Sequence, residues 1–295
     1  MNESNKKTVK AYAKINLHLD VMGIAENGYH LVSTVMQTLS LCDDVYVSLT
    51  DADRHTVSCT DPSIPTDEKN LVWRAADIFF DRAAISKHAD IKITKRIPAA
   101  AGLAGGSADA AAVFIALNEL CGYPLTTEEL LLAGASLGAD VPFCIMGGTK
   151  FADRFGDVLH DFPSMPSCYI VVSAGKEGVS TPWAYSLLDT EFDGFRAGVY
   201  EPRRINVLRA AAEEGDLSGI CGNTYNIFEG VIEKERADVS TLRGKLTECG
   251  ALCSMMSGSG PSVFGIFDDL KKAEAARDTL SGDGFAAFVC EPISR

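Results

Sequence analysis

A segment almost free of side chains precedes a helix-like sequence within residues 98–120. Its first half consists of Gly, Ala and Ser, and Gly102, Gly105 and Gly106 allow positive φ and close approach of a ligand to the backbone. A helix that begins near Ser107 has unpaired N–H groups and the positive end of its dipole at this loop. Such a site can bind phosphate, and Ser107 can cap the helix or contact a phosphate oxygen or an Mg²⁺-bound water. Tight packing of a helix against a sheet also requires small residues, so the segment alone leaves both interpretations open.

The common phosphate-binding motifs do not fit this segment. The P-loop requires a Lys after its last Gly, and no Lys follows these glycines; the dinucleotide motif requires a Gly spacing that is absent. A second segment, Ser257–Ser262, reads Ser-Gly-Ser-Gly-Pro-Ser and lies between two strand-like runs. It is either a hairpin turn or the opposite wall of an anion site.

Several polar residues stand in apolar surroundings where they could perform chemistry. Lys14 lies in the strand-like run AYAKINLHLD, where the alternative role is that of an edge-strand lysine. Asp140 follows a helix that ends at Gly138, and it is either a turn or cap residue or a functional carboxylate. His30 follows an Asn-Gly turn and is either a partly buried, hydrogen-bonded histidine or a ligand-binding one.

The cysteines and histidines do not indicate a metal site. The nine Cys are scattered, and the close pair Cys249 and Cys253 lacks two further ligands at similar spacing. The five His show no ligand spacing. We therefore expect free thiols in a reducing compartment.

Composition indicates a globular, cytoplasmic protein of one large or two ordinary domains. The 295 residues are 46% hydrophobic and 23% charged, and the net charge is 27 − 40 = −13. This charge argues against nucleic acid and anionic membrane surfaces as partners. The sequence contains neither a signal-peptide pattern nor an apolar run of the roughly 18 residues that span a bilayer.

Hydrophobic periodicity predicts a mixture of strands and helices that is typical of an α+β protein. Strands are expected at 9–21, 29–41, 44–49, 91–97, 167–174 and 285–291, with hairpins at 149–162 and 254–267. Helices are expected at 70–82, 107–120, 126–137, 181–188, 203–213, 225–234, 240–249 and 268–281.

Taken together, these segments resemble the GHMP kinase superfamily. Its middle motif, Pro-x-x-x-Gly-Leu-x-(Gly)-Gly-Ser, is matched by residues 98–107, and its C-terminal glycine-rich motif by residues 257–263. The runs AKINLHLDVMGIAENGYHLVSTVMQTLSL and LGADVPF resemble the branch that acts on 4-diphosphocytidyl-2-C-methyl-D-erythritol. The resemblance covers essentially the whole chain and is weakest over residues 190–250.

The resemblance implies a two-domain GHMP kinase fold. Residues 1–160 would form an ATP-binding α/β domain related to a ribosomal-protein domain, and residues 161–295 a ferredoxin-like α+β domain. The implied activity is phosphorylation of the substrate 2-hydroxyl with ATP and Mg²⁺, in non-mevalonate isoprenoid (terpenoid) precursor biosynthesis. The implied partners are small molecules alone, and the expected state is a monomer or weak homodimer.

Site residues follow from the resemblance position by position. Lys14 and Asp140 match the catalytic pair, in which Asp140 would accept the proton of the attacking hydroxyl. The cytidine-bearing substrate would be held by Asn16, Tyr29, His30 and Tyr185. The ATP loop is matched by Pro98, Ala99, Ala100, Ala101, Gly102, Leu103, Ala104, Gly105, Gly106 and Ser107. No residue is assigned as a direct metal ligand, with Ser107 the candidate contact to Mg²⁺. Many relatives carry Ser-Ser at the end of this loop, whereas this chain has Ser107 followed by Ala108.

Two other functions stay open at this point. One is another GHMP-type enzyme that acts on a different small alcohol or decarboxylates its substrate with ATP. The other is a non-catalytic module that binds nucleotide or RNA, although the charge of −13 argues against RNA.

Overall fold

The chain divides into two compact units, each built from separate stretches of sequence. The computed structural model describes residues 5–195 and 200–294. The first unit contains Met1–Ala13, Cys42–Ala99 and Ala104–Met146, and the second contains Lys14–Leu41, Ala100–Leu103 and Gly147–Arg295. This division differs from the predicted single boundary near residue 160, because the stretch at 14–41 clusters with the later part of the chain.

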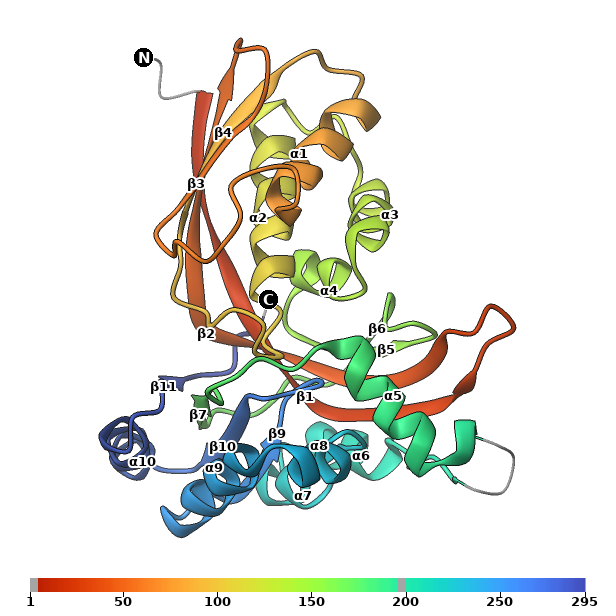
Figure 1. The fold of residues 1–295 in the computed structure, drawn as a ribbon, viewed down its shortest axis with the longest axis vertical. Coiled ribbons are helices and arrows are strands. Elements are labelled where there is room, and N and C mark those ends of the chain that lie inside the picture. Colours follow the sequence, from red (N-terminus) through yellow and green to blue (C-terminus); the bar gives the residue numbers. More distant parts are fainter. Residues whose placement is uncertain (1–4, 196–199, 295) are drawn as a thin grey trace. The chain divides into compact units, whose positions relative to one another are not determined.

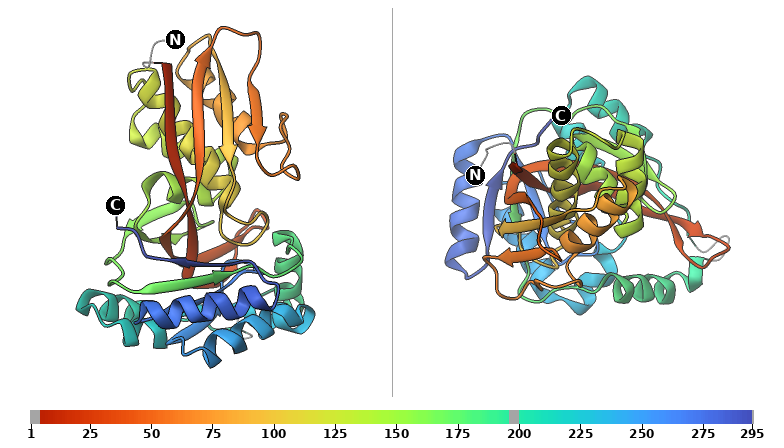
Figure 2. Two further views of the ribbon diagram at one scale, coloured as in Figure 1. Left: turned by 90° about the vertical axis from the view of Figure 1, so that its left-hand side faces the viewer. Right: turned by 90° about the horizontal axis from the view of Figure 1, so that it is seen from above.

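Two long strands, β1 (Lys6–Ile24) and β2 (His30–Thr50), run through both units. The first unit also contains β3 (Thr56–Cys59), β4 (His88–Thr94), α1 (Leu71–Arg82), α2 (Gly105–Leu120), α3 (Thr127–Leu137) and α4 (Asp140–Met146). β4 pairs antiparallel with the end of β2 and parallel with β3. The helices lie on one side of these strands (Figures 1 and 2), and the core between them contains Val47, Phe79, Ile91 and Phe114.

Local capping explains where the helices of the first unit begin. The Asn70 side chain accepts a hydrogen bond from the Val72 N–H, and Thr126 and Glu129 form a reciprocal capping box. The predicted starts of these two helices are therefore confirmed. The short helix α4 was not predicted, and it places Asp140 at its first residue rather than in a loop.

In the second unit, short strands extend the edges of β1 and β2. β5 (Thr149–Asp153) pairs antiparallel with residues 34–37 of β2 and with β6 (Val158–Asp161), which confirms the predicted hairpin. β8 (Tyr225–Asn226) runs parallel to β1 at His18 and Leu19. The prediction of a helix over 225–234 was wrong at its start, since the helix there, α8 (Glu229–Glu235), begins after β8.

A separate four-stranded antiparallel sheet completes the second unit. Its order is β11 (Ala287–Cys290), β7 (Tyr169–Ser173), β10 (Val263–Phe267) and β9 (Cys253–Met256). Helix α9 (Ala237–Glu248) precedes β9, and α10 (Leu270–Gly282) connects β10 to β11. This chain order and strand order confirm the expected ferredoxin-like arrangement. Leu242, Leu246 and Leu280 of these helices share one core with Val171 and Phe267 of the sheet.

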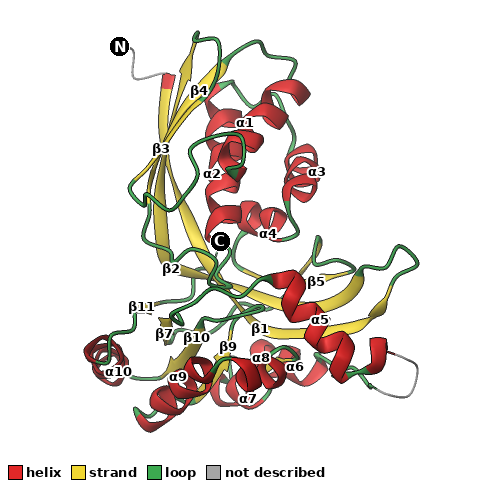
Figure 3. Ribbon diagram, viewed as in Figure 1, coloured by secondary structure: helices red, strands yellow, loops and turns green. Residues whose placement is uncertain are grey.

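The remaining helices of the second unit are short. They are α5 (Thr181–Glu191), a 3₁₀ turn at Asp193–Phe195, α6 (Asn206–Glu214) and α7 (Leu217–Gly222). Figure 3 shows that both units mix helices with strands, as the α+β prediction requires. In the described ranges no helix has the length and apolarity needed to cross a membrane.

Candidate active site

The side-chain-poor loop leads directly into the N-terminus of α2. Ala100, Gly102 and Ala104 have φ of 49°, 76° and 57°, so two alanines adopt a conformation that costs an L-residue about 1–2 kcal/mol. Ala104 is the N-cap residue, and its methyl group cannot accept a hydrogen bond from the first turn. The N–H groups of that turn therefore keep their capacity to bind an anion. Ser107 lies inside this turn, so the prediction that it caps the helix was wrong.

The second Gly/Ser segment is hydrogen-bonded to the first. The Ser257 hydroxyl donates to the Gly102 carbonyl at 3.1 Å, and the Ser262 N–H donates to the Ala101 carbonyl at 3.2 Å. A Cβ atom at position 102 would lie 2.3 Å from the Ser257 carbonyl oxygen. The close approach of the two backbones thus requires Gly102, both for its φ and for its missing side chain.

Asn226 and Glu229 hold the start of this second segment in place. The buried Asn226 amide donates to the carbonyls of Met256 at 2.7 Å and Gly258 at 2.8 Å. The Glu229 carboxylate accepts from the Met256 N–H at 2.8 Å, and burial raises the pKa of this carboxyl. The segment 226–229 resembles a family segment near the substrate, but no role was predicted for it, because the partners of Asn226 lie about 30 residues away and share no local motif with it.

Lys14 belongs to a line of buried polar side chains on β1. It is 3% exposed, so it is not a solvated edge-strand lysine, and its ammonium donates to the Asn16 side chain at 2.7 Å. The Asn16 amide donates in turn to the Thr34 hydroxyl at 2.8 Å. The Lys14 N–H also donates to the carbonyl of Leu103 in the loop, at 3.1 Å. The structure thus joins Lys14, Asn16 and the loop backbone within the second unit.

The same face of β1 continues with His18 and Asp20. Both are buried, and the Tyr200 hydroxyl donates to Asp20 at 2.6 Å. Burial, together with the charge of Arg203, lowers the pKa of His18 to about 4. Within the described residues, the His18 Nε2 has no hydrogen-bond partner.

Two of the predicted substrate-binding residues are in direct contact. The rings of His30 and Tyr185 stack with centroids 4.4 Å apart, and His30 Nε2 lies 2.7 Å from the Asp189 carboxylate. Tyr185 also contacts Phe228 edge to face. Tyr29 is 68% exposed and its ring contacts Phe155 instead of this group. Asp189 and Phe228 were not predicted as part of the site. Phe228 lies in the segment 226–229, which resembles a family segment near the substrate but was assigned no chemical role, and Asp189 belongs to no recognisable motif.

Asp140 occupies the first turn of α4 in the first unit. It is half-buried, and its neighbours Val141, Pro142 and Phe143 are buried. The buried helix face fixes the position of the carboxylate, which the sequence pattern LGADVPF could not show.

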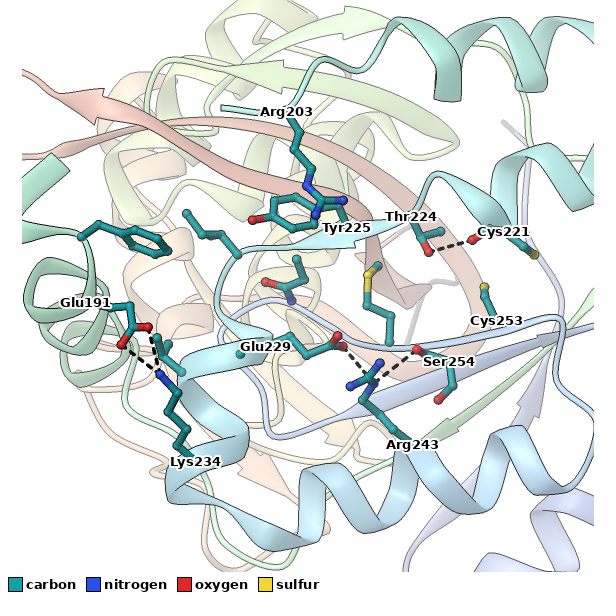
Figure 4. A pocket seen from close by; sticks show the side chains of 16 residues that line it. Glu191, Arg203, Cys221, Thr224, Tyr225, Glu229, Lys234, Arg243, Cys253 and Ser254 are labelled. Carbon is teal, nitrogen blue, oxygen red and sulfur yellow. Dashed lines mark hydrogen bonds and ion pairs between the residues drawn. The ribbon is translucent and has the colours of Figure 1, made fainter. Parts of the chain in front are cut away.

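A cavity of about 680 Å³ lies in the second unit beside Asn226 and Glu229 (Figure 4). Arg243 contacts the Glu229 carboxylate at 3.2 Å, Lys234 pairs with Glu191, and the Arg203 guanidinium lies 3.9 Å from the Tyr225 ring centre. The cavity lining includes none of the residues predicted to bind ATP or substrate. Its lining includes Asn226 and Glu229, the two residues whose side chains hold the start of the Gly/Ser segment.

The residues suit a nucleotide better than a protein-bound metal. In the described part of the chain, no three His, Cys, Asp or Glu side chains are grouped to hold a metal ion. An uncapped helix N-terminus beside a glycine loop fits phosphate oxygens, and Mg²⁺ bound to ATP keeps most of its ligands as water and phosphate.

Family models match both halves of the chain. The model for the GHMP kinases N-terminal domain matches residues 70–148, and the model for the GHMP kinases C-terminal domain matches residues 204–286. The matched regions include the loop before α2 and the paired Gly/Ser segment. Fold and site therefore define the class of protein as the GHMP kinases, which are small-molecule kinases.

Comparison with individual relatives identifies one family within the GHMP kinases. The chain is 41% identical to the 4-diphosphocytidyl-2-C-methyl-D-erythritol kinase of Acetivibrio thermocellus, over 97% of this chain and 99% of the relative. It is 39% identical to the enzyme of the same name from Gloeobacter violaceus, over 97% and 94%. The chain belongs to the 4-diphosphocytidyl-2-C-methyl-D-erythritol kinase family.

Solved structures agree with this assignment. A crystal structure of 4-(cytidine 5'-diphospho)-2C-methyl-D-erythritol kinase superposes with a TM-score of 0.82 at 28% identity, covering 98% of this chain and all of that one. Mevalonate kinase of L. major superposes with a TM-score of 0.77 at 17% identity, over 100% and 99% of the chains, and shares the fold. These matches confirm the expected two-domain GHMP kinase fold.

Proposed function

We propose that the protein transfers the γ-phosphoryl group of ATP to the 2-hydroxyl of 4-diphosphocytidyl-2-C-methyl-D-erythritol, giving the 2-phosphate and ADP. The observation that carries this proposal is the uncapped N-terminus of α2, which follows a loop whose backbone is hydrogen-bonded to a second Gly/Ser segment. In a chain 41% identical to a kinase of this name, that loop is well suited to bind the ATP phosphates.

Phosphoryl transfer requires positioning and neutralisation of charge more than covalent catalysis. The N–H groups of residues 105–107 and the dipole of α2 bind the β- and γ-phosphates, and Ser107 contacts a phosphate oxygen or an Mg²⁺-bound water. Mg²⁺, when bound with ATP, neutralises phosphate charge. Asp140 accepts the proton of the attacking hydroxyl, and Lys14 stabilises negative charge on the transferring group.

The cytidine end of the substrate is assigned to the aromatic group around His30. Tyr185 and His30 already stack on each other at 4.4 Å, so the cytosine packs on the outer face of this pair and not between the rings. Stacking of a base on an aromatic ring contributes about 1–3 kcal/mol. Asn16 and Tyr29 complete the proposed substrate contacts.

The test is ADP formation by the purified protein with ATP, Mg²⁺ and a panel of alcohols. We expect turnover with the cytidine-diphosphate substrate and a loss of at least a hundredfold in kcat/KM with the same methylerythritol phosphate lacking cytidine. Mevalonate and homoserine serve as controls for other GHMP kinases. Equal turnover of a substrate without cytidine, or release of carbon dioxide, would contradict the proposal.

A further inference from the structure

A buried cluster of three charged side chains lies in the first unit, close in sequence to both ends of the loop. The Lys95 ammonium is 2.5 Å from the Asp43 carboxylate and 2.6 Å from the Asp109 carboxylate. The three side chains are 5%, 0% and 4% exposed, respectively. None of them belongs to the motifs that indicated the kinase, and none has a role in the mechanism above.

The cluster connects the two ends of the loop. Lys95 directly follows β4, ahead of the loop, whereas Asp109 lies in the second turn of α2, after it. Asp43 of β2 also accepts hydrogen bonds from the Arg96 and Ile97 N–H groups, at 2.5 and 2.9 Å. The backbone that enters the loop and the helix that leaves it are therefore both held by the same charged centre.

The ammonium also lies against the first residue of α2. A Cβ atom at Gly105 would be 3.0 Å from Lys95 Nζ and 3.0 Å from Ile97 Cγ2. Lys95 thus limits how far the first turn of α2 can move toward the sheet. The groups with ionisable side chains that face Asp109 here are Lys95, Asp43 and the Cys59 thiol.

The cluster is not expected to add much to the free energy of unfolding. Two carboxylates share one ammonium in a buried place, and a buried ion cluster of this kind is often no more stable than apolar side chains of similar volume. Asp109 Oδ1 has no hydrogen-bond partner among the residues the structure describes, which adds a desolvation cost. What the cluster supplies instead is geometry, because it fixes both loop ends with charge-assisted hydrogen bonds.

We propose that Lys95, held between Asp43 and Asp109, is a positioning residue that sets the path of the phosphate loop and the first turn of α2 for nucleotide binding. This inference rests on the proposed function, in which that turn binds the ATP phosphates. It predicts that disturbing the cluster weakens nucleotide binding selectively and leaves the alcohol site unchanged.

The experiment compares Asp109→Asn, Lys95→Arg and Lys95→Met with the wild-type protein. ADP affinity is measured by calorimetry, and KM for each substrate and kcat by ADP formation. We expect Lys95→Met and Asp109→Asn to weaken ADP binding and raise KM for ATP by roughly tenfold, about 1.4 kcal/mol, with KM for the alcohol within about twofold. Lys95→Arg keeps the charge and should recover most of the affinity.

Two further variants separate positioning from folding. Glu119→Gln removes the partly exposed ion pair with Lys7 at the far end of α2 and should leave ADP affinity unchanged. The variant Lys95→Met/Asp43→Asn/Asp109→Leu removes all charge from the cluster and should fold with a melting temperature close to the wild type, yet still bind ADP weakly. Wild-type ADP affinity in this folded variant, or equal losses of KM for both substrates, would overturn the proposal. Because ADP binding needs no alcohol, the result also stands if the proposed acceptor proves wrong.

Discussion

At the scale of single residues, the environment of each polar side chain decides what it can do. Lys14 is buried and hydrogen-bonded to Asn16, so its charge is held at a fixed place and is little screened by water. Asp140 is fixed by the buried face of α4. His18 is buried on the same strand face as Lys14, in a setting that keeps its imidazole neutral.

Replacing Asp140 by Asn should lower kcat by a factor of about 10²–10⁴, because the variant keeps the shape of the carboxylate but cannot accept a proton. KM for both substrates and the melting temperature should change little. ADP release under saturating substrates measures the effect, with Glu128→Gln at the start of α3 as a control. Wild-type turnover in Asp140→Asn would remove this residue from the mechanism.

His18 should make the free energy of unfolding depend on pH. Its pKa is about 4 in the folded protein, because burial and Arg203 disfavour the charged form, against an ordinary value of 6.5. As pH falls below 6.5, the unfolded chain binds a proton that the folded protein does not, so stability is lost until pH reaches about 4. The loss from this group between pH 7.5 and 5 is about 2 kcal/mol.

Denaturant titrations at these two pH values, on the wild type and His18→Phe, test this expectation. Taking the difference between the two proteins cancels the contributions of other titrating groups. The variant should be less sensitive to acid by about the amount given above. If both proteins lose the same stability, His18 titrates normally.

At the scale of elements, the site depends on two loops that support one another. The loop before α2 carries the N–H groups for an anion, and the Ser257–Ser262 segment fixes its backbone at Ala101 and Gly102. Asn226 and Glu229 fix that segment in turn. Such a chain of buried hydrogen bonds keeps two strained alanines in the left-handed region before any ligand binds.

Gly102→Ala should separate the two loops, because the new methyl group would overlap the Ser257 carbonyl and φ is +76°. We expect weaker ADP binding and a loss of stability above about 1 kcal/mol. Calorimetry and thermal unfolding measure both effects. Gly122→Ala is the matched control, since Gly122 has a φ of +79° but nothing within 4 Å of its Cβ position. Equal effects of the two substitutions would show that φ alone, and not the contact between loops, is responsible.

Local signals in the sequence predicted most elements, and distant contacts explain what was missed. The Thr126 and Glu129 box and the Asn70 cap are encoded within four residues, so those helix starts could be predicted. β8 has only two residues and forms because β1 supplies its partner, so no periodicity could indicate it. Likewise, the loop was evident from its glycines, whereas the partners of Lys95 lie 52 and 14 residues away.

At the scale of the whole molecule, the protein carries a net charge of −13, although its site is proposed to bind polyanions. Local N–H groups and Lys14 must therefore attract phosphate against the field of the protein. The same field disfavours nucleic acid, whose binding depends on the release of counterions by clustered Lys and Arg.

We expect no binding of RNA at 0.15 M salt, because the charge of the protein repels the phosphate backbone. Gel-shift or fluorescence anisotropy with a labelled single-stranded RNA measures this, and binding of a fluorescent ATP analogue in the same buffer is the positive control. Micromolar RNA affinity that falls steeply with salt would favour the RNA-binding alternative over an exclusively small-molecule enzyme.

The interrupted course of the chain through its two units has a consequence for protein synthesis. Every residue of the unit that holds α1–α4 has been made once Met146 is added, so this unit can fold on the ribosome. The stretch Lys14–Leu41 is made among the first, yet its Leu19 and Val32 pack in a core with Ile227 and Phe228. While most of the chain is still being translated, these apolar side chains lack their final neighbours, and surface exposed in this way is prone to aggregation.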